Sequence, residues 1–411
     1  GEGAREGARE GAREGARGGA NNATGSIVEE GGLDEDAEKA WHRMMEEAAD
    51  YPVCTELDKG LLEGCDCKTS LLCHNKMSGE YCRKEDCVMP ITQEHLTLSK
   101  DVTAYSGYGT PDVYKVASSY CMVEGTVNAN SRRRWGKFAV LPASCRPKKN
   151  LIFQVSNDGA AARLDVLSSG EVKWEGGGHK DGLISFSGIS FGAGASDHLT
   201  LEVAHGFSAY STDTLGWPSY VLKGFQCSLE GAVTSANYHA LSMSTLPVEC
   251  RPTKRLMFSA WGDTGASRVD IWKNGKIFWV GGKIGKFVSL SGISFGLNSK
   301  LEKPLPLTNM QPFGGAYGTP TYMILVGRCV VEGLAKFSKA LSKHAVVSTL
   351  PVGCRPKKSL IFSTNHHDTP LRLDVKTDGQ VIWAGGKMVH NWLSFTGISF
   401  ATKDTIDLLK K

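Results

Sequence analysis

Apolar and charged residues alternate in short stretches along the C-terminal three quarters of the chain, and the clearest stretch occurs three times. Residues 163–166, 268–271 and 372–375 each read Arg, apolar, Asp, apolar. Because alternate side chains of a strand point to opposite faces, we expect the apolar pair to face a core and the Arg and Asp to lie side by side on the solvent face. A dipeptide typical of hairpin turns follows each stretch: Ser169-Gly170, Asn274-Gly275 and Asp378-Gly379.

Other motifs recur in the same register. The sequence Leu-Pro-x-x-Cys-Arg-Pro begins at Leu141, Leu246 and Leu350, and its cysteines are spaced by 105 and 104 residues. Each copy then has a tryptophan 29 residues after that cysteine and ends in Gly-Ile-Ser-Phe. Alternation assigns these tryptophans to the core: Trp174, Trp279 and Trp383. Agreement between three copies in one chain is direct evidence of a repeated fold.

Each copy has about eight short strands separated by turn residues and no stretch of helical periodicity. The sequence therefore predicts a mainly β protein with three tandem β-sandwich modules that resemble jelly rolls. We place the modules at residues 94–193, 194–297 and 298–403, followed by a C-terminal tail at 404–411. Three segments precede them: a low-complexity flexible tail at 1–33, a helix at 34–50 and a cysteine-rich segment at 51–93.

Twelve cysteines fall into two groups. Each module holds two, 23 to 25 residues apart, which predicts three disulfides: Cys121–Cys145, Cys227–Cys250 and Cys329–Cys354. The other six lie in the cysteine-rich segment: Cys54, Cys65, Cys67, Cys73, Cys82 and Cys87. We expect these to form disulfides too, with zinc binding that includes His74 as the alternative. Disulfides indicate an oxidising compartment, and the glycosylation sequon at Asn22 agrees with secretion.

Charge and motif content argue against several classes of function. The net charge is +4 and lysines and arginines form no basic stripe, so we expect no nucleic-acid partner. No run of 18 apolar residues occurs, so we expect no membrane span. The common catalytic motifs are absent, and three near-equal copies are unusual for an enzyme, so we predict a non-enzyme without cofactor or metal. The chain starts without a signal peptide, and we expect an extracellular or cell-surface protein from which any such segment has been removed.

The repeated motifs resemble a known group of proteins. The sequence Leu-Pro-x-x-Cys-Arg-Pro-Lys-Lys-x-Leu-Ile-Phe, the Arg-Leu-Asp-Val strand and the ending Leu-Ser-Phe-x-Gly-Ile-Ser-Phe are similar to the C-terminal β-modules of phage tail and receptor-binding proteins. Repeats with the same cysteine occur in dinoflagellate algal proteins. The resemblance covers residues 94–403 and implies a jelly-roll-like sandwich with a surface or carbohydrate-binding role. Because such phage modules commonly act as trimers, it also implies that the three copies form a pseudo-threefold head.

Candidate contact residues are those that differ between copies in loops. Trp261 and Asp263 lie in a loop between two strands, and Trp272 is on an outward strand face beside a hairpin turn. In module 3 the position that corresponds to Trp261 and Asp263 holds a polar loop with His366, His367 and Asp368. An exposed aromatic beside polar groups is typical of a sugar platform. The alternatives are a loop Trp that packs on its own domain and, for the histidines, a metal site or a plain polar loop.

Two sets of repeated charges are interpreted as structural. The Arg/Asp pairs could hold an acidic sugar or a cation, but surface ion pairs are the favoured interpretation. The basic pairs after each Arg-Pro are interpreted as solvated turn charges: Lys148-Lys149, Lys254-Arg255 and Lys357-Lys358.

These observations favour a secreted or cell-surface multivalent binding or adhesion protein that recognises carbohydrate through module loops. Its partners would be glycans or other extracellular proteins, and linked sites would gain avidity. The alternative is a structural subunit of an extracellular filament, matrix or large assembly, which predicts self-association. A third hypothesis is an accessory subunit of an organellar complex.

Overall fold

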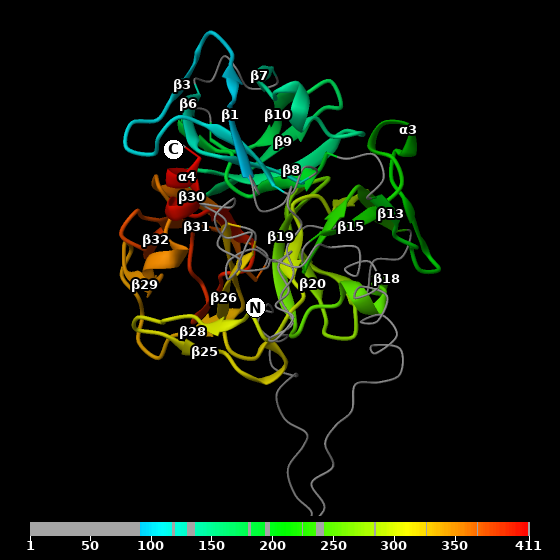
Figure 1. Ribbon diagram of the computed structural model, residues 1–411. Helices are drawn as coiled ribbons and strands as arrows, with labels where there is room; N and C mark the ends of the chain where they lie inside the picture. The colour runs from blue at the N-terminus through cyan, green and yellow to red at the C-terminus, as the bar shows by residue number, and fades with distance from the viewer. Residues whose placement is uncertain are drawn as a thin grey trace, which may run out of the picture.

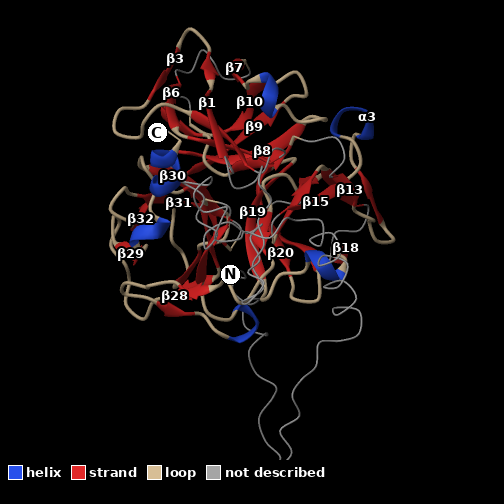
Figure 2. Cartoon of the chain, in the orientation of Figure 1, coloured by secondary structure: helices blue, strands red, loops and turns tan. Residues whose placement is uncertain are grey.

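The computed structural model describes residues 91–409, apart from 117–119, 130–135, 180–181, 194–197, 224, 236–241, 283–284, 326 and 368. The predicted flexible tail, the predicted helix and nearly all of the cysteine-rich segment, with its six cysteines and Asn22, lie outside the described residues. The rest of the chain forms three lobes of antiparallel strands, with only short helices (Figures 1 and 2). No helix among the described residues has the length and apolar character needed to cross a membrane.

Module 1 is a sandwich of two antiparallel sheets and starts three residues before the predicted boundary. Its small sheet has the order β1 (Ile91–His95), β4 (Asp112–Val116), β5 (Tyr120–Glu124) and β12 (Ile189–Gly192). Its large sheet has the order β2 (Thr97–Leu98), β7 (Lys137–Val140), β10 (Glu171–Gly177), β9 (Ala160–Val166), β8 (Leu151–Asn157), β11 (Gly182–Ser185), β6 (Thr126–Ala129) and β3 (Val102–Ala104).

Module 2 repeats the arrangement. Its small sheet has the order β13 (His198–Thr200), β15 (Ser219–Lys223), β16 (Gln226–Glu230) and β23 (Ser294–Gly296). Its large sheet has the order β14 (Phe207–Ala209), β17 (Ala232–Ser235), β22 (Val288–Ser289), β19 (Leu256–Gly262), β20 (Gly265–Ile271), β21 (Lys276–Gly282) and β18 (Ser242–Thr245). A short helix, α3 (Thr212–Leu215), precedes β15.

Module 3 has the same strands, with its large sheet divided in two. The small sheet has the order β24 (Lys303–Pro304), β26 (Thr321–Leu325), β27 (Arg328–Glu332) and β34 (Ile398–Ala401). The other two sheets have the orders β25 (Gln311–Pro312), β28 (Leu334–Lys336), β33 (Trp392–Ser394) and β29 (Val346–Thr349), β32 (Gln380–Gly385), β31 (Thr369–Val375), β30 (Leu360–His366). The predicted C-terminal tail is a helix for most of its length, α4 (Lys403–Leu408), which begins with the Thr402 hydroxyl capping the amide of Thr405.

The predicted sandwich core and module disulfides are confirmed. Each module has its own apolar cluster, which contains its disulfide and its tryptophan. The three core tryptophans are buried, with exposed fractions of 0%, 8% and 9% in chain order. Disulfides join the three predicted cysteine pairs, with Cα–Cα distances of 5.8, 5.4 and 5.2 Å. In each module the second cysteine ends a short 3-10 turn: Ala143–Cys145, Val248–Cys250 and Val352–Cys354.

The repeated Arg-Pro motif supports the repeated hairpin turn. In module 3, Arg355 Nε donates a hydrogen bond to the carbonyl oxygen of Leu350, 3.1 Å away, and Arg251 does the same to Leu246 in module 2. The Arg355 side chain thereby lies over the turn glycine Gly379, whose φ is +93°. The two motifs therefore recur together because one packs on the other.

Gly379→Ala is expected to destabilise the protein by about 1–3 kcal/mol, because φ near +90° strains any residue with a Cβ. An added Cβ would also come within 2.5 Å of the Leu350 carbonyl oxygen. Urea denaturation measures the effect. The control is Gly314→Ala, where φ is +83° but no atom lies within 4 Å of the added Cβ. Equal losses for the two variants would contradict the role of the contact with Leu350.

The three modules close into a ring around a pseudo-threefold axis, the arrangement that the phage resemblance implies (Figure 1). The central strands β8, β19 and β30 contact one another pairwise. A buried glutamate of each module accepts a hydrogen bond from a backbone amide of the module before it. These bonds run from Gly192 to Glu230, from Gly296 to Glu332 and from Ala401 to Glu124, at 2.7, 2.7 and 2.5 Å. The third bond joins module 3 back to module 1 and closes the ring.

Candidate binding site

The repeated Arg/Asp pairs lie in the three interfaces between modules, which we call the 1–2, 2–3 and 3–1 interfaces. Arg268 and Asp270 of the 2–3 interface are 6% and 0% exposed, and Arg372 and Asp374 of the 3–1 interface are 8% and 3% exposed. The expectation that these pairs lie on a solvent face is therefore wrong. They do point away from their own core, as the alternation predicts, but the next module covers them.

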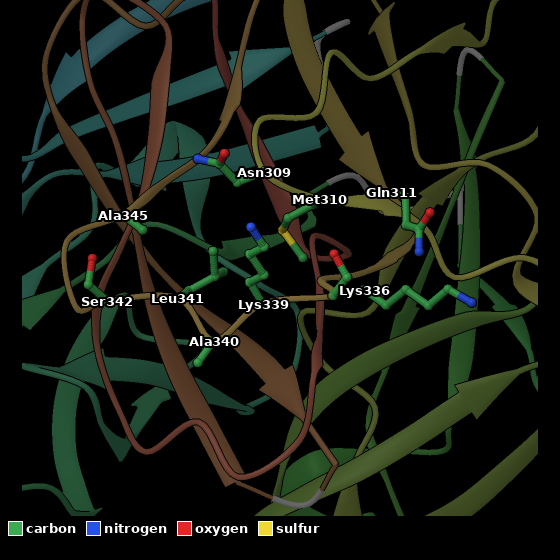
Figure 3. A pocket seen from close by; sticks show the side chains of 10 residues that line it. Asn309, Met310, Gln311, Lys336, Lys339, Ala340, Leu341, Ser342 and Ala345 are labelled. Atoms are coloured by element: carbon green, nitrogen blue, oxygen red, sulfur yellow. The ribbon is translucent and has the colours of Figure 1, made fainter.

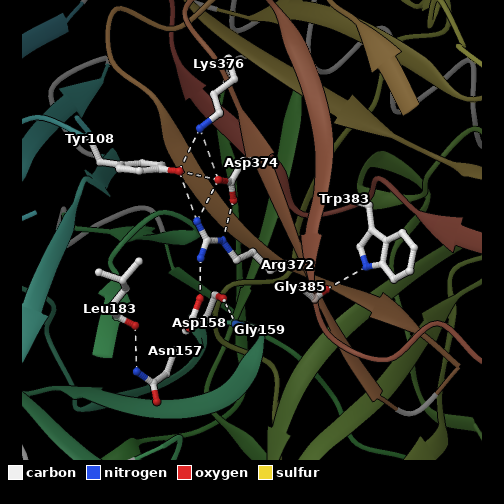
Figure 4. A network of polar contacts seen from close by, with 11 residues as sticks. Tyr108, Asn157, Asp158, Gly159, Leu183, Arg372, Asp374, Lys376, Trp383 and Gly385 are labelled. Carbon is white, nitrogen blue, oxygen red and sulfur yellow. Dashed lines mark hydrogen bonds and ion pairs between the residues drawn. The ribbon is translucent and has the colours of Figure 1, made fainter. Parts of the chain in front are cut away.

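The 3–1 interface holds a network that centres on Arg372 (Figure 4). Its Nε and Nη2 donate to the two carboxylate oxygens of Asp374, at 2.7 and 2.8 Å. Its Nη1 reaches across the interface to Asp158 of module 1, at 2.6 Å. Tyr108, also of module 1, donates to Asp374 at 2.5 Å and accepts from Lys376 Nζ at 2.9 Å. One arginine thus links two carboxylates that belong to different modules.

The protonation states of this network follow from burial and charge. Burial alone would lower the pKa of Arg372, but the hydrogen bonds and charge of Asp374 outweigh it and the net shift is upward. Burial, helped by Asp374, raises the pKa of Tyr108. The pKa of Lys376 is also raised, since the Tyr108 hydroxyl and Asp374 outweigh its burial. At neutral pH the site therefore presents two cations and a phenol that keeps its proton.

A cavity of about 320 Å³ opens beside this network. Its lining residues come from both modules: Tyr108, Asp158, Lys343, His344, Arg372, Asp374, Lys376, Ile382 and Ala384. Three of them are lysine or arginine, against two carboxylates, so the cavity has a slight excess of positive charge. Polar donors beside a tyrosine ring suit a polar ligand with hydroxyl or acidic groups.

The same position at the 2–3 interface has a different surface, made of aromatic rings around an arginine. The guanidinium of Arg255 lies 5.0 Å from the Trp272 ring and 4.9 Å from the ring of Tyr317 in module 3. Phe278 lies on the neighbouring strand, 4.8 Å from Trp272. Trp272 is 39% exposed, as the prediction of an outward face requires. These rings give the 2–3 interface an apolar platform with a charged and a hydroxyl group beside it.

Trp261 does not reach solvent, so its prediction as a contact residue is wrong. It is 6% exposed and belongs to an apolar cluster between modules 1 and 2. Its indole lies against Gly176 and Gly177, where an added Cβ would come within 3.3 and 2.6 Å of the ring. Trp261 lies on β19 and not in a loop as predicted, and its side chain packs module 2 against module 1.

His366 is also a structural residue, which contradicts its prediction as a ligand-binding residue. The residue is 0% exposed, and its Nε2 accepts hydrogen bonds from the amides of Val389 and His390 at 2.8 and 2.9 Å. The other ring nitrogen lies 2.7 Å from the Trp392 carbonyl oxygen, so it must carry the proton. Both nitrogens are engaged, and the ring has none to offer a metal or a sugar.

The remaining predicted loop residues have mixed positions. His367 has its Nδ1 3.4 Å from Arg268 Nη1, across the 2–3 interface. Asp263 is exposed and accepts from the amide of Lys286 at 3.1 Å, which stabilises its own loop. Asp368 lies outside the described residues. The structure therefore does not bring the predicted residues together into one site.

Three of the lysines interpreted as solvated turn charges are interface residues instead. Lys254 is 7% exposed and donates to Glu302 and Thr321 of module 3, both at 2.6 Å. At the equivalent places, Lys358 donates to Asp112 at 2.6 Å and Lys149 to Ser219 at 2.8 Å. Burial lowers the pKa of Lys149. These lysines therefore fasten the ring and are not available to a sulfated glycan.

Module 3 has a further cavity of about 450 Å³ in its own loops (Figure 3). Its lining is mostly polar: Asn309, Met310, Gln311, Lys336, Ser338, Lys339, Ala340, Leu341, Ser342 and Ala345. Figure 3 shows the Lys336 side chain extending away from the other lining residues, so the cavity holds no convergent set of groups.

One exposed tryptophan among the described residues is absent from the predicted contact residues. Trp217 is 62% exposed, next to the 1–2 interface, where its carbonyl oxygen accepts from Lys149. The equivalent residues of the other modules are Thr110 and Thr319, so Trp217 differs between copies as Trp261 does. The same criterion would have found it.

The comparisons with known proteins give no family. No protein-family model matches the sequence, and no curated protein matches it significantly. Among the described residues, no group of three or more His, Cys, Asp or Glu side chains could hold a metal ion. The fold and the interfaces define the class of this molecule as a single-chain, pseudo-threefold head of three disulfide-containing β-sandwiches.

Proposed function

We propose that this chain is a secreted or cell-surface binding protein that recognises carbohydrate at the outer ends of its module interfaces. The observation that carries the proposal is the exposed Trp272 platform, with Arg255 and Tyr317 beside it. A sugar ring offers a CH face to an indole and hydroxyl groups to the polar neighbours, so this combination suits a glycan. The module disulfides agree with an oxidising compartment.

The equivalent position at the 3–1 interface extends the proposal. Lys376 stands where module 2 has Trp272, and Tyr108 stands where module 3 has Tyr317. The head would then present two sites with one geometry and different chemistry, an aromatic one and a basic one. A glycan with both neutral and acidic residues could engage both sites and gain avidity from the rigid ring.

Trp272→Ala is expected to weaken glycan binding about fivefold, because stacking of this kind contributes on the order of 1 kcal/mol. The measurement is a glycan array with wild-type protein, followed by titration calorimetry on the best ligand. Trp217→Ala is the matched control, since that indole is 62% exposed and belongs to another interface. We expect the control to bind like wild type.

Three results would count against the proposal. If folded wild-type protein binds nothing on a broad glycan array, carbohydrate recognition is not its function. A loss of binding in Trp217→Ala alone moves the site to the 1–2 interface. Concentration-dependent self-association without glycan binding would favour the structural subunit of a filament or matrix.

A further inference from the structure

The cavity of the 3–1 interface has polar side chains that the Arg372 network does not use. Lys343 and His344 line it from one turn of module 3, and both residues are exposed. Among the described residues, neither of these side chains has a partner for a hydrogen bond or an ion pair. An ammonium with three N–H groups and an imidazole are therefore available to a ligand in this cavity.

Module 1 supplies a hydrogen-bond acceptor to the same cavity. The Asp158 side chain is 57% exposed, and its Oδ1 accepts from Arg372 Nη1 at 2.6 Å, which leaves Oδ2 available. Asp374 differs, since it is only 4% exposed and both of its oxygens accept from Arg372. Figure 4 shows the Arg372 guanidinium between Lys376 and Asp158. The cavity therefore has an ammonium on one side of this guanidinium and an available carboxylate oxygen on the other.

The backbone holds His344 in a conformation that residues with a Cβ rarely adopt. Its φ is +70°, in the left-handed region, where any residue other than glycine is strained. The His344 amide donates to the carbonyl oxygen of Trp383 at 2.8 Å, and Trp383 belongs to the core of module 3. The core thereby fixes the turn that carries Lys343 and His344. Strain of this kind is concentrated at binding and active sites, where it places side chains for a ligand.

The size of the cavity and its one aromatic ring of a tyrosine restrict the ligand. A volume of about 320 Å³ is at the small end of the roughly 300–1,000 Å³ typical of ligand pockets, so the cavity suits a single sugar residue. The Lys376 ammonium lies over the Tyr108 ring, 4.6 Å from its centre, and the Tyr105 ring lies 5.3 Å away. Because these groups occupy the surroundings of the ring, polar contacts and not stacking decide what binds here.

We propose that the 3–1 cavity binds one uronic acid residue of an acidic glycan, with Lys343 and His344 donating to its carboxylate and Asp158 Oδ2 accepting from a ring hydroxyl. The inference rests on the proposed function, because it names the kind of sugar that the 3–1 site takes. Three lysine or arginine side chains line the cavity against two carboxylates, so one bound carboxylate balances the charge. A uronic acid is scarcely larger than a neutral hexose, whereas a sulfate ester adds a bulky group. Modules 1 and 3 both contribute, so the site exists only in the closed ring.

Titration calorimetry of the full chain with trigalacturonic acid and with its methyl ester tests the role of the carboxylate. The ester keeps the ring hydroxyls but has no negative charge. We expect the acid to bind about tenfold more tightly, because hydrogen bonds to charged groups are the stronger kind. Raising sodium chloride from about 0.05 to 0.5 M is expected to weaken binding of the acid and not of the ester, since salt screens exposed charges.

Lys343→Met is expected to weaken binding of trigalacturonic acid about tenfold and to leave binding of the ester unchanged. The variant should fold, because Lys343 is exposed. Lys339→Met is the matched control, since Lys339 is an exposed lysine of the same segment that lines the other cavity of module 3. His344→Gly is expected to weaken binding of the acid severalfold without lowering the melting temperature, because glycine is not strained at this φ.

The possible failures separate this inference from the proposed function. Equal binding of the acid and the ester, or unchanged binding of the acid in Lys343→Met, would overturn the uronic acid site. The proposed function would remain if another glycan still depends on Trp272. Tighter binding of a sulfated trisaccharide than of the acid would also overturn the site, since the anionic group would then be a sulfate. Wild-type protein that binds no glycan at all would overturn both.

Discussion

Asp270→Ala is expected to lower the free energy of unfolding by about 3–5 kcal/mol, the usual cost of breaking a buried ion pair from one side. Asp270 is 0% exposed and accepts hydrogen bonds from two arginines. Arg268 donates to both of its oxygens, at 2.6 and 2.7 Å, and Arg255 Nε donates to one of them at 2.9 Å. Removing the carboxylate leaves two guanidiniums facing each other in the 2–3 interface. Urea denaturation at pH 7 measures the loss.

Asp165→Ala is the matched control, because it breaks the equivalent pair at the 1–2 interface. There the carboxylate side chain is 14% exposed and pairs with Arg163 alone, so we expect a smaller loss. A double variant, Arg268→Met with Asp270→Leu, is expected to recover only part of the stability, since apolar replacement of a buried pair is often neutral but Arg255 still loses its carboxylate. Equal losses for Asp165→Ala and Asp270→Ala would show that the second arginine does not matter.

The sandwich could be predicted because its signals are local. Each signal depends only on the core of one module: period-two alternation, glycine-containing turns and the recurring cysteines. The same signals occur in all three copies, which strengthens the prediction. Trp174 illustrates this: its alternation with Val172 alone places it inward, and it is fully buried in the core of module 1. The disulfide pairing follows from the same recurrence, two cysteines to each copy.

The interfaces could not be predicted because alternation says nothing about what covers the outer face. Arg372 points away from its own core, as its strand position requires, and module 1 then buries it. Trp261 is predicted as a contact residue because it differs between copies, and the alternative of packing on its own module is only part of its environment, which includes Phe287 of module 2 and Ile152 of module 1. Its other partners, Gly176 and Gly177, lie in module 1. Closure of the ring was expected from the phage resemblance and not from any residue pattern.

The candidate site was therefore only partly predictable. Residues that differ between copies include both residues buried between modules and residues exposed on the surface. The sequence does not distinguish the two kinds. Trp272 follows β20 and stays exposed, whereas Trp261 lies on the β19–β20 hairpin that packs against module 1. Knowing the ring geometry first would have separated the two.

The protein is expected to lose stability as pH rises from about 4.5 to 8, and Glu332→Gln to remove part of that loss. Burial raises the pKa of Glu332 from 4.5 to about 7, against the opposing effects of Lys254 and the Gly296 amide. Burial also raises the pKa of Glu124 to about 7, opposed by Lys358 and the Ala401 amide. Between pH 4.5 and 7 each carboxyl therefore binds more protons in the folded state than in the unfolded state. The free energy of unfolding falls over this range, by on the order of 3 kcal/mol for each glutamate.

The sign of the effect makes Glu332→Gln a discriminating variant. Glutamine is neutral at every pH and still offers an oxygen to the Gly296 amide, so it resembles the protonated glutamate. We expect the variant to match wild type near pH 4.5 and to be more stable than wild type at pH 8, as measured by urea denaturation across this range. Glu230→Gln is the control at the equivalent place, where His198 Nε2 lies 3.0 Å from the carboxylate. There the substitution removes the negative charge beside the His198 ring. A Glu332→Gln variant that is less stable than wild type at pH 8 would mean that the ionised carboxylate stabilises the ring, and that Lys254 outweighs the cost of burying it.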